Sequence, residues 1–140
     1  MSDKARSGCP VSLGLDIFGD KWTLLIIRDL MFSGKRHFRE MLDSDEHISS
    51  NILADRLKML VAEGILSKGE DPGHKQKVVY SLTEKGIALL PILMQISHWS
   101  YTYQPVDEAY ALSEAAREQD GPAQWEKRIE ALRETHLLDN

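Results

Sequence analysis

Very few side chains in this sequence have the type and spacing that catalysis or metal binding requires. The five histidines show no i, i+3 or i, i+4 pairing with one another, and Cys9 is the single cysteine, which excludes an internal disulfide and a cysteine-based zinc cage. Ser44, Asp45 and His47 lie together in a predicted loop, without the arrangement of a catalytic triad. We also find no glycine-rich phosphate-binding loop. The sequence therefore predicts a protein that is not an enzyme, with no metal and no cofactor.

Hydrogen bonding to a polar partner is the chemistry that remains, and one predicted helix is suited to it. The helix covers about Ser50 to Glu63, because Ser49 is a natural N-cap and Gly64 suits the left-handed residue after a helix C-terminus. Turning 100° per residue gives an apolar stripe of Ile52, Leu53, Leu57 and Leu60. The opposite face is small and polar, and it carries Asn51, Ala54, Asp55 and Lys58. Such a face could enter the major groove of DNA, or it could simply be solvated.

The elements before this helix also have recognisable boundaries. Pro10 suits the first turn of a helix that ends at Phe18, with Cys9 at or just before the N-cap. Asp20 can cap a second helix from Lys21 to about Phe32. A dense basic cluster, residues 35–39, then leads into a short helix and an acidic turn, Asp43 to His47. Two short helices joined by a turn, the second capped by serine, are typical of a helix-turn-helix.

After this pair of helices, the spacing of the hydrophobic residues changes to the alternation that is typical of strands. Ile65 to Lys68 and Lys77 to Leu82 are predicted strands, joined by a tip longer than a two-residue turn. A helix-turn-helix followed by a hairpin is a winged-helix layout. The next helix, Glu84 to roughly Tyr101, should be kinked by Pro91. Two further helical patterns, at 106–118 and 123–138, are expected to be less firmly packed.

The distribution of charge divides the chain. Residues 1–86 hold 13 Lys+Arg and 13 Asp+Glu, whereas residues 87–140 hold 4 and 9, which accounts for the whole net charge of −5. We predict a flexible tail at 1–8, a winged helix-turn-helix domain at 9–103 and an acidic helical extension at 104–140. The sequence shows no secretory signal and no apolar run long enough for a membrane span, so we expect a cytoplasmic protein.

Many pieces of the sequence, in the right order, together resemble the HxlR-type family of bacterial winged-helix transcription regulators. They are Cys9-Pro10-Val11, Gly19-Asp20-Lys21-Trp22, Leu24 to Leu30, Phe38, Ile48-Ser49, Leu53, Arg56-Leu57-Lys58, Leu60, Gly64-Ile65, and Tyr80 to Thr83 with Gly86. The resemblance covers about residues 9 to 100. It implies a mostly helical α+β fold, with a two-stranded wing and extra C-terminal helices, and a homodimer that binds double-stranded DNA. Pro10 to Phe18 and Glu84 to Tyr101 would build the dimer interface.

In this context we predict DNA contacts from three places. Those on the recognition helix are Ser49, Ser50, Asn51, Ala54, Asp55 and Lys58. Arg56 lies at the margin of the apolar stripe, so an internal ion pair is an equal alternative to DNA contact. The remaining phosphate-contact candidates are Arg36 and Arg39 before the recognition helix and Lys75, Gln76 and Lys77 on the wing.

Two kinds of signal input are open to such a regulator. Several members of the family sense oxidants or electrophiles through the cysteine of this Cys-Pro pair, so Cys9 is a redox-sensing candidate beside the alternative of an inert structural cysteine. The aromatic residues Phe18, Trp22 and Trp99, with His98, could line a small-molecule effector pocket or belong to the core. The predicted function is a regulator that binds a pseudo-palindromic operator as a homodimer. The alternative is a winged-helix module for protein interaction, without DNA binding.

Overall fold

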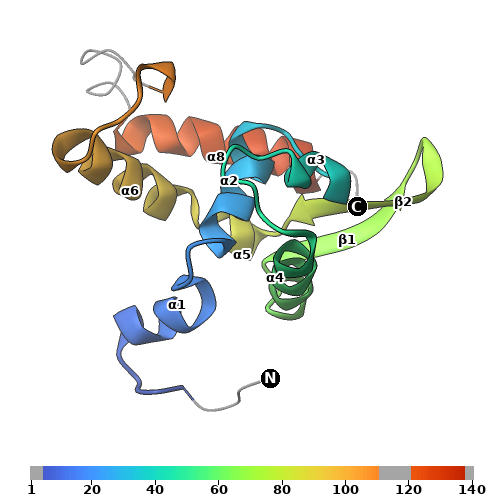
Figure 1. Ribbon diagram of the computed structural model, residues 1–140, viewed down its shortest axis with the longest axis horizontal. Coiled ribbons are helices and arrows are strands. Elements are labelled where there is room, and N and C mark those ends of the chain that lie inside the picture. The colour runs from blue at the N-terminus through green and yellow to red at the C-terminus, as the bar shows by residue number, and fades with distance from the viewer. Residues whose placement is uncertain (1–4, 111–120, 138–140) are drawn as a thin grey trace.

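The computed structural model describes residues 5–110 and 121–137, with the backbone alone at 74–76. Within these ranges it is mostly helical with one two-stranded antiparallel hairpin, so the predicted winged-helix fold is confirmed (Figure 1). In chain order the described elements are α1 (Pro10–Phe18), α2 (Thr23–Phe32), α3 (Phe38–Leu42), α4 (Ser50–Ala62), β1 (Leu66–Asp71), β2 (His74–Leu82), α5 (Glu84–Ile87), α6 (Leu90–Tyr103), the 3-10 helix η1 (Glu108–Tyr110) and α8 (Pro122–Leu137).

Helix α4, the predicted recognition helix, begins at Ser50 as expected and ends at Ala62, one residue before the predicted end. The Ser49 hydroxyl accepts a hydrogen bond from the Ile52 amide at 3.2 Å. At the other end Gly64 has a φ of 75°, its N–H reaches the Val61 carbonyl at 3.0 Å, and the Ile65 N–H reaches the Leu60 carbonyl at 2.9 Å. This pair of bonds is the Schellman arrangement, in which a left-handed residue lets two orphan carbonyls find donors.

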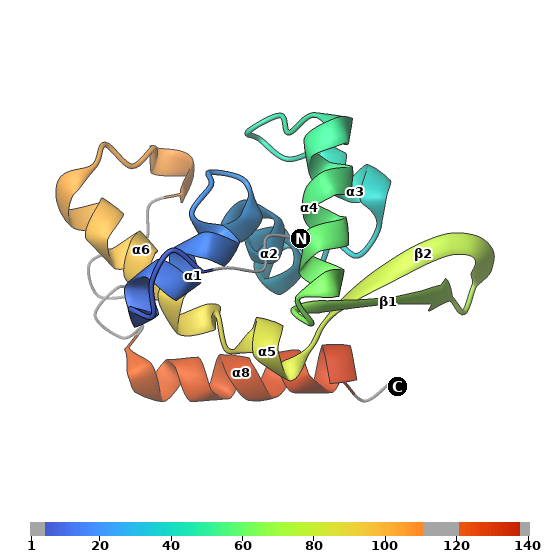
Figure 2. The same cartoon turned by 90° about the horizontal axis from the view of Figure 1, so that it is seen from below.

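One apolar core joins α2, α4, the base of the wing, α5 and α6. The most deeply buried side chains include Ile27, Leu53, Leu60, Leu82 and Leu90, each with less than 1% of its surface exposed. Helix α1 lies at the edge of this core: none of its residues is buried, although Ile17 and Phe18 pack partly against the core. Both views place α1 and α6 toward one end of the molecule and the wing at the other (Figures 1 and 2).

Helix α2 begins at Thr23, two residues later than predicted. The Asp20 carboxylate accepts the amide N–H groups of Trp22 at 3.0 Å and Thr23 at 3.1 Å, which keeps Lys21 and Trp22 in the turn that leads into the helix. Asp20 still satisfies donors at the start of α2, although it is not the residue that directly precedes the helix.

The prediction of a long tip for the wing was wrong. The strands extend to Asp71 and His74, which pair with each other and leave only Pro72 and Gly73 between them. The Asp71 carboxylate accepts the Gly73 N–H at 2.8 Å and closes this short turn. The additional residues near the tip belong to β2, where the pairing with β1 is irregular. Glu70 pairs with Val78, whereas the next residue, Asp71, pairs with His74.

Pro91 divides the predicted long helix instead of kinking it. Helix α5 ends at Ile87 and α6 starts at Leu90, with Pro91 in its first turn, where the missing proline N–H costs no hydrogen bond. The Thr83 hydroxyl caps α5 by accepting the Gly86 N–H at 3.2 Å.

The C-terminal helix α8 is packed more firmly than expected. Leu132 and His136 are buried, and Trp125 and Ile129 pack partly against the core. Figure 2 shows α8 running beside α5. The predicted helix at 106–118 lies largely outside the described residues, and its described part contains only η1. None of the helices in the described ranges has the length and apolar character that a membrane span would need.

Candidate nucleic-acid interface

The polar face of α4 is open to solvent in the described structure. Its exposed residues are Ser49, Ser50, Asn51, Ala54, Asp55 and Lys58. The opposite side packs into the core through Leu53, Leu57 and Leu60, so the predicted division into two faces is confirmed. The face is therefore presented outward on a helix whose rotation is fixed by three buried leucines.

A buried polar network that the sequence analysis missed holds the turn that leads into α4. Asp29 of α2 is 3% exposed, and its carboxylate accepts a short hydrogen bond from the Ser44 hydroxyl, which also contacts the Met41 carbonyl at 2.8 Å. Arg28 bridges Asp29 at 2.9 Å and Glu46 at 2.7 Å. In the sequence, this network is indicated by the adjacent charged residues Arg28 and Asp29 within the apolar run that forms α2.

Arg56 takes the internal ion pair that the sequence left open. Its Nε donates to the Asp20 carboxylate at 2.9 Å, and its guanidinium also contacts Asp55. Burial raises the pKa of Asp20, but hydrogen bonds from Thr23 and Arg56 outweigh it and lower the pKa to about 2. Arg56 thus ties α4 to the start of α2.

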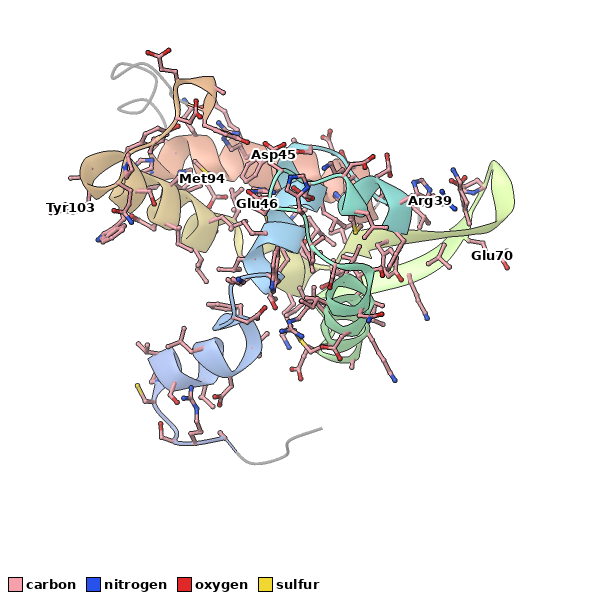
Figure 3. The ribbon with its side chains drawn as sticks, viewed as in Figure 1. Arg39, Asp45, Glu46, Glu70, Met94 and Tyr103 are labelled. Carbon is pink, nitrogen blue, oxygen red and sulfur yellow. The ribbon has the colours of Figure 1, made fainter. Side chains whose placement is uncertain are left out.

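Arg36 is also engaged within the protein. Its guanidinium donates to the Tyr80 carbonyl and to the Ser81 hydroxyl, both at 2.6 Å, and its carbonyl accepts the Tyr80 N–H at 2.9 Å. These bonds fasten the loop before α3 to strand β2. Among the predicted phosphate contacts of this region, Arg39 is the exposed one; Figure 3 labels it on α3 together with Glu70 on the wing.

His37 forms a second link between α3 and the wing. Its Nδ1 lies 2.8 Å from a Glu40 oxygen, and its Nε2 lies 2.8 Å from an Asp71 oxygen. The pKa of Asp71 is lowered by the Gly73 N–H and by His37, and that of Glu40 by the Arg36 N–H and by His37. Sequence analysis gave His37 no role, because its carboxylate partner Asp71 is remote in the chain.

The wing presents exposed cations on both strands. Lys77 on β2 is exposed as predicted, whereas the side chains of Lys75 and Gln76 lie outside the described part of the structure. Lys68 on β1 is exposed as well. It was not among the predicted DNA contacts, because the sequence assigned it only to a strand.

Cys9 is exposed at the N-cap of α1. The backbone N–H groups of Ser12 and Val11, in the first turn of α1, lower the pKa of its thiol. Lys4 and Arg6 are the cations nearest to Cys9 in the sequence. Lys4 lies outside the described residues, and Arg6 is paired with Asp16 at 2.7 Å. The helix N-terminus is therefore the source of the shift.

Two cavities in the described part of the chain each contain one of the four effector-pocket candidates. Trp22 lines a cavity of only about 10 Å³ next to Met41 and Ile48. Trp99 lines an apolar groove of about 470 Å³ between α6 and α8, together with Ile92 and Trp125. Phe18 and His98 are half-buried. Within the described ranges, no group of three or more His, Cys, Asp or Glu side chains is placed to hold a metal ion.

Comparison with known proteins agrees with this architecture. The family model described as HxlR-like helix-turn-helix matches residues 17–108. The transcriptional regulator YybR of Bacillus subtilis is 33% identical over 114 residues, which are 81% of this chain and 90% of the relative. The regulator YodB of the same organism is 36% identical over 66% of this chain and 82% of its own length.

Solved structures give the same result. PA1607, described as a putative transcription factor, superposes with a TM-score of 0.67 at 36% identity and covers 76% of this chain and 73% of its own. The oxidized redox regulator HypR superposes with a TM-score of 0.58 at 35% identity over 70% of this chain and 100% of its own. This chain therefore belongs to the HxlR-like helix-turn-helix family of transcriptional regulators, and it is not an enzyme.

Proposed function

We propose that this regulator binds a pseudo-palindromic operator as a homodimer, with the two α4 helices in successive major grooves. The observation that carries this proposal is the exposed, capped polar face of α4 beside a basic-edged wing. A helix of this kind fits the major groove, and two of them related by a twofold axis would lie about 34 Å apart.

The proposed contacts divide into two kinds. Ser49, Ser50, Asn51, Ala54 and Asp55 face base edges or the adjacent backbone, where hydroxyl, amide and carboxylate groups can read hydrogen-bonding patterns. Phosphate contacts come from Lys58, Arg39, Lys75, Gln76 and Lys77, to which we add Lys68. Arg36 and Arg56 are left out of this set, because their guanidinium groups already bind the protein; they position the wing and α4.

The proposed homodimer is supported by exposed apolar surface at one end of the molecule. Helix α1 exposes Val11 by 70% and Leu15 by 48%, and α6 exposes Trp99 by 57% and Tyr103 by 69%. Exposed large apolar side chains that are concentrated in two helices favour an interface over a solvated surface. The groove between α6 and α8 extends this surface.

A signal from oxidants or electrophiles at Cys9 completes the proposal. Its thiol is exposed, the pKa of the thiol is lowered, and Cys9 lies at the N-cap of α1, which we place in the dimer interface. Among similar structures, HypR is described as a redox regulator, and YodB has been solved in reduced, diamide-treated and quinone-bound forms. Modification there would alter the relative orientation of the two α4 helices.

Lys58→Ala tests the DNA interface. An operator is first selected from a random duplex library, and its affinity is then measured by mobility shift over a range of salt concentrations. Each lost phosphate contact should reduce the magnitude of the slope of log association constant against log salt concentration by about one per subunit. The affinity should also be weaker at every salt concentration. The matched control is Lys127→Ala on α8, where an exposed lysine lies outside the proposed interface.

An unchanged slope in Lys58→Ala would remove Lys58 from the contact set. A wild-type protein that binds no duplex at low salt would contradict DNA binding altogether. It would instead favour a winged-helix module for protein interaction, a function for which the acidic last third of the chain gives a reason.

A further inference from the structure

A cleft on the side of the molecule bounded by α2 and α6 is lined by none of the proposed DNA contacts, and it shares Ile96 with the groove between α6 and α8. Its volume is about 690 Å³, within the range of small-molecule sites. Its walls come from α2, from the turn before α4, from α6, from η1 and from α8. Figure 3 labels two residues of facing walls, Met94 on α6 and Asp45 in the turn before α4. We call it the α2–α6 cleft.

The walls of the α2–α6 cleft are largely apolar and aromatic. Leu93 and Met94 form a buried floor, with 9% and 7% of their surfaces exposed. Phe32 and Tyr110 also line the cleft but remain 44% and 56% exposed. Partly exposed aromatic rings inside a concave site can pack against a planar, apolar ligand group.

Charged side chains of both signs line the cleft. Three cations, Arg28, Lys35 and Arg128, face two carboxylates, Asp29 and Asp45, although the whole chain carries a net charge of −5. The Asp45 carboxylate accepts a hydrogen bond from the Tyr110 hydroxyl. Arg28 is held in place by its bonds to Asp29 and to Glu46 outside the cleft.

Lys35 is the cation best placed to bind a ligand. Its Nζ lies 3.8 Å from the Asp29 carboxylate, which already accepts bonds from Arg28 and from the Ser44 hydroxyl. An ammonium group has three donors, and this long contact leaves donors for an incoming carboxylate. The Arg128 guanidinium lies 6.0 Å from the centre of the Phe32 ring, so positive charge and an aromatic face adjoin each other.

We propose that the α2–α6 cleft binds an aromatic carboxylate, with its ring against Phe32 and Met94 and its carboxylate on Lys35. A ligand in the cleft would contact α6, and it would also contact Ser44 and Asp45, which lie in the turn that leads into α4. The ligand therefore shifts operator affinity. This last step, unlike the binding itself, rests on the proposed function.

Isothermal titration of the full chain with 1-naphthoate, in the absence of DNA, tests the site. The expected result is saturable binding of one molecule per subunit. Lys35→Met should weaken it about tenfold, as should replacement of the ligand by the neutral isostere 1-naphthamide. Lys127→Met is the matched control and should bind as the wild type does. Ser97→Trp, at an exposed position that lines the cleft, should abolish binding without disturbing the core.

Three results would each overturn the proposal: no saturable binding by the wild type, full binding by Ser97→Trp, or equal affinities for naphthoate and naphthamide. Operator affinity is then measured with and without naphthoate. Binding in the cleft without any change in operator affinity would overturn the coupling step. Failure of the unliganded protein to bind DNA would contradict the proposed function and leave the titration result valid.

Discussion

At the scale of single residues, the structure separates basic side chains that the sequence presents alike. Lys58 extends from the outer face of α4 into solvent, whereas Arg56, two positions earlier, pairs with Asp20 at 2.9 Å. Arg36 and Arg39 differ in the same way, because only Arg36 binds the backbone of β2. Partners that are remote in the chain therefore decide which cations are available to phosphate.

The prediction at the scale of single residues concerns Cys9. Oxidant or quinone treatment should change operator affinity, and Cys9→Ser should abolish that change while leaving the affinity of the untreated protein near that of the wild type. The reason is that the thiolate is the reactive form, and the helix N-terminus favours it. A mobility shift before and after treatment provides the measurement.

Met94→Leu is the control for Cys9→Ser, because methionine is the other side chain that oxidants convert readily. It keeps the volume of a buried residue nearly constant. An undiminished oxidant response in Cys9→Ser would exclude Cys9 as the sensor.

At the scale of elements, α8 is an integral support of the winged helix. His136 near its C-terminus is 2% exposed, and its Nδ1 accepts the Leu82 N–H, at the end of β2, at 3.0 Å. The imidazole also hydrogen-bonds the Leu30 carbonyl of α2. One side chain thus joins α8 to the wing and to the core, and it must be neutral to accept at one nitrogen and donate at the other.

This arrangement predicts a loss of stability in acid. Burial is the largest cause that lowers the pKa of His136, from 6.5 to about 4, and the nearby Arg36 guanidinium adds to it. Below pH 6.5 the unfolded chain binds a proton that the folded protein excludes, so the free energy of unfolding falls as the pH drops toward 4. Between pH 7.5 and pH 5 the loss from this group is about 2 kcal/mol, measurable by urea unfolding.

His136→Gln should remove that part of the pH dependence, since glutamine does not titrate. His47→Gln is the matched control, because His47 is exposed in the turn before α4. Parallel pH profiles for His136→Gln and the wild type would contradict the assignment. Other groups contribute to both profiles, so the difference between the two proteins is the quantity to compare.

At the scale of the whole molecule, the two ends have different surfaces. The wing and α4 offer polar and basic groups, whereas α1 and α6 at the other end expose large apolar side chains (Figure 1). Helix α1 has no buried residue in the subunit, although its sequence is strongly apolar. In the proposed homodimer, α1 of each subunit would be buried against the second subunit.

Val11→Glu should therefore shift the protein from dimer to monomer. A charge placed in an apolar interface weakens dimerisation by at least about tenfold, and it cannot damage the core because Val11 is 70% exposed in the subunit. Sedimentation velocity over a range of concentrations measures the change.

Ala131→Glu, at an exposed position on α8, is the control and should sediment as the wild type does. A wild-type protein that sediments as a monomer at all concentrations would refute the homodimer. A dimeric Val11→Glu would place the interface away from the N-terminal half of α1.

The local features of the fold were predictable because short-range rules set them. Ser49 and Gly64 determine the ends of α4, and Thr83 caps α5. The spacing of Leu53, Leu57 and Leu60 determined the buried side, and with it the outer face that became the candidate DNA interface. The length of the wing and the start of α6 were missed, because Asp71 could close a tight turn and Pro91 could begin a helix.

The sequence by itself determined the elements, the capped helix with its polar face and, through many matching pieces, the family. Capping and periodicity act over a few residues, so they can be read along the chain. Only the tertiary structure decided which cations are free, that α8 holds β2 through His136, and that α2 and α6 enclose a cleft. Each of these depends on groups that are distant in sequence and meet only when the core forms.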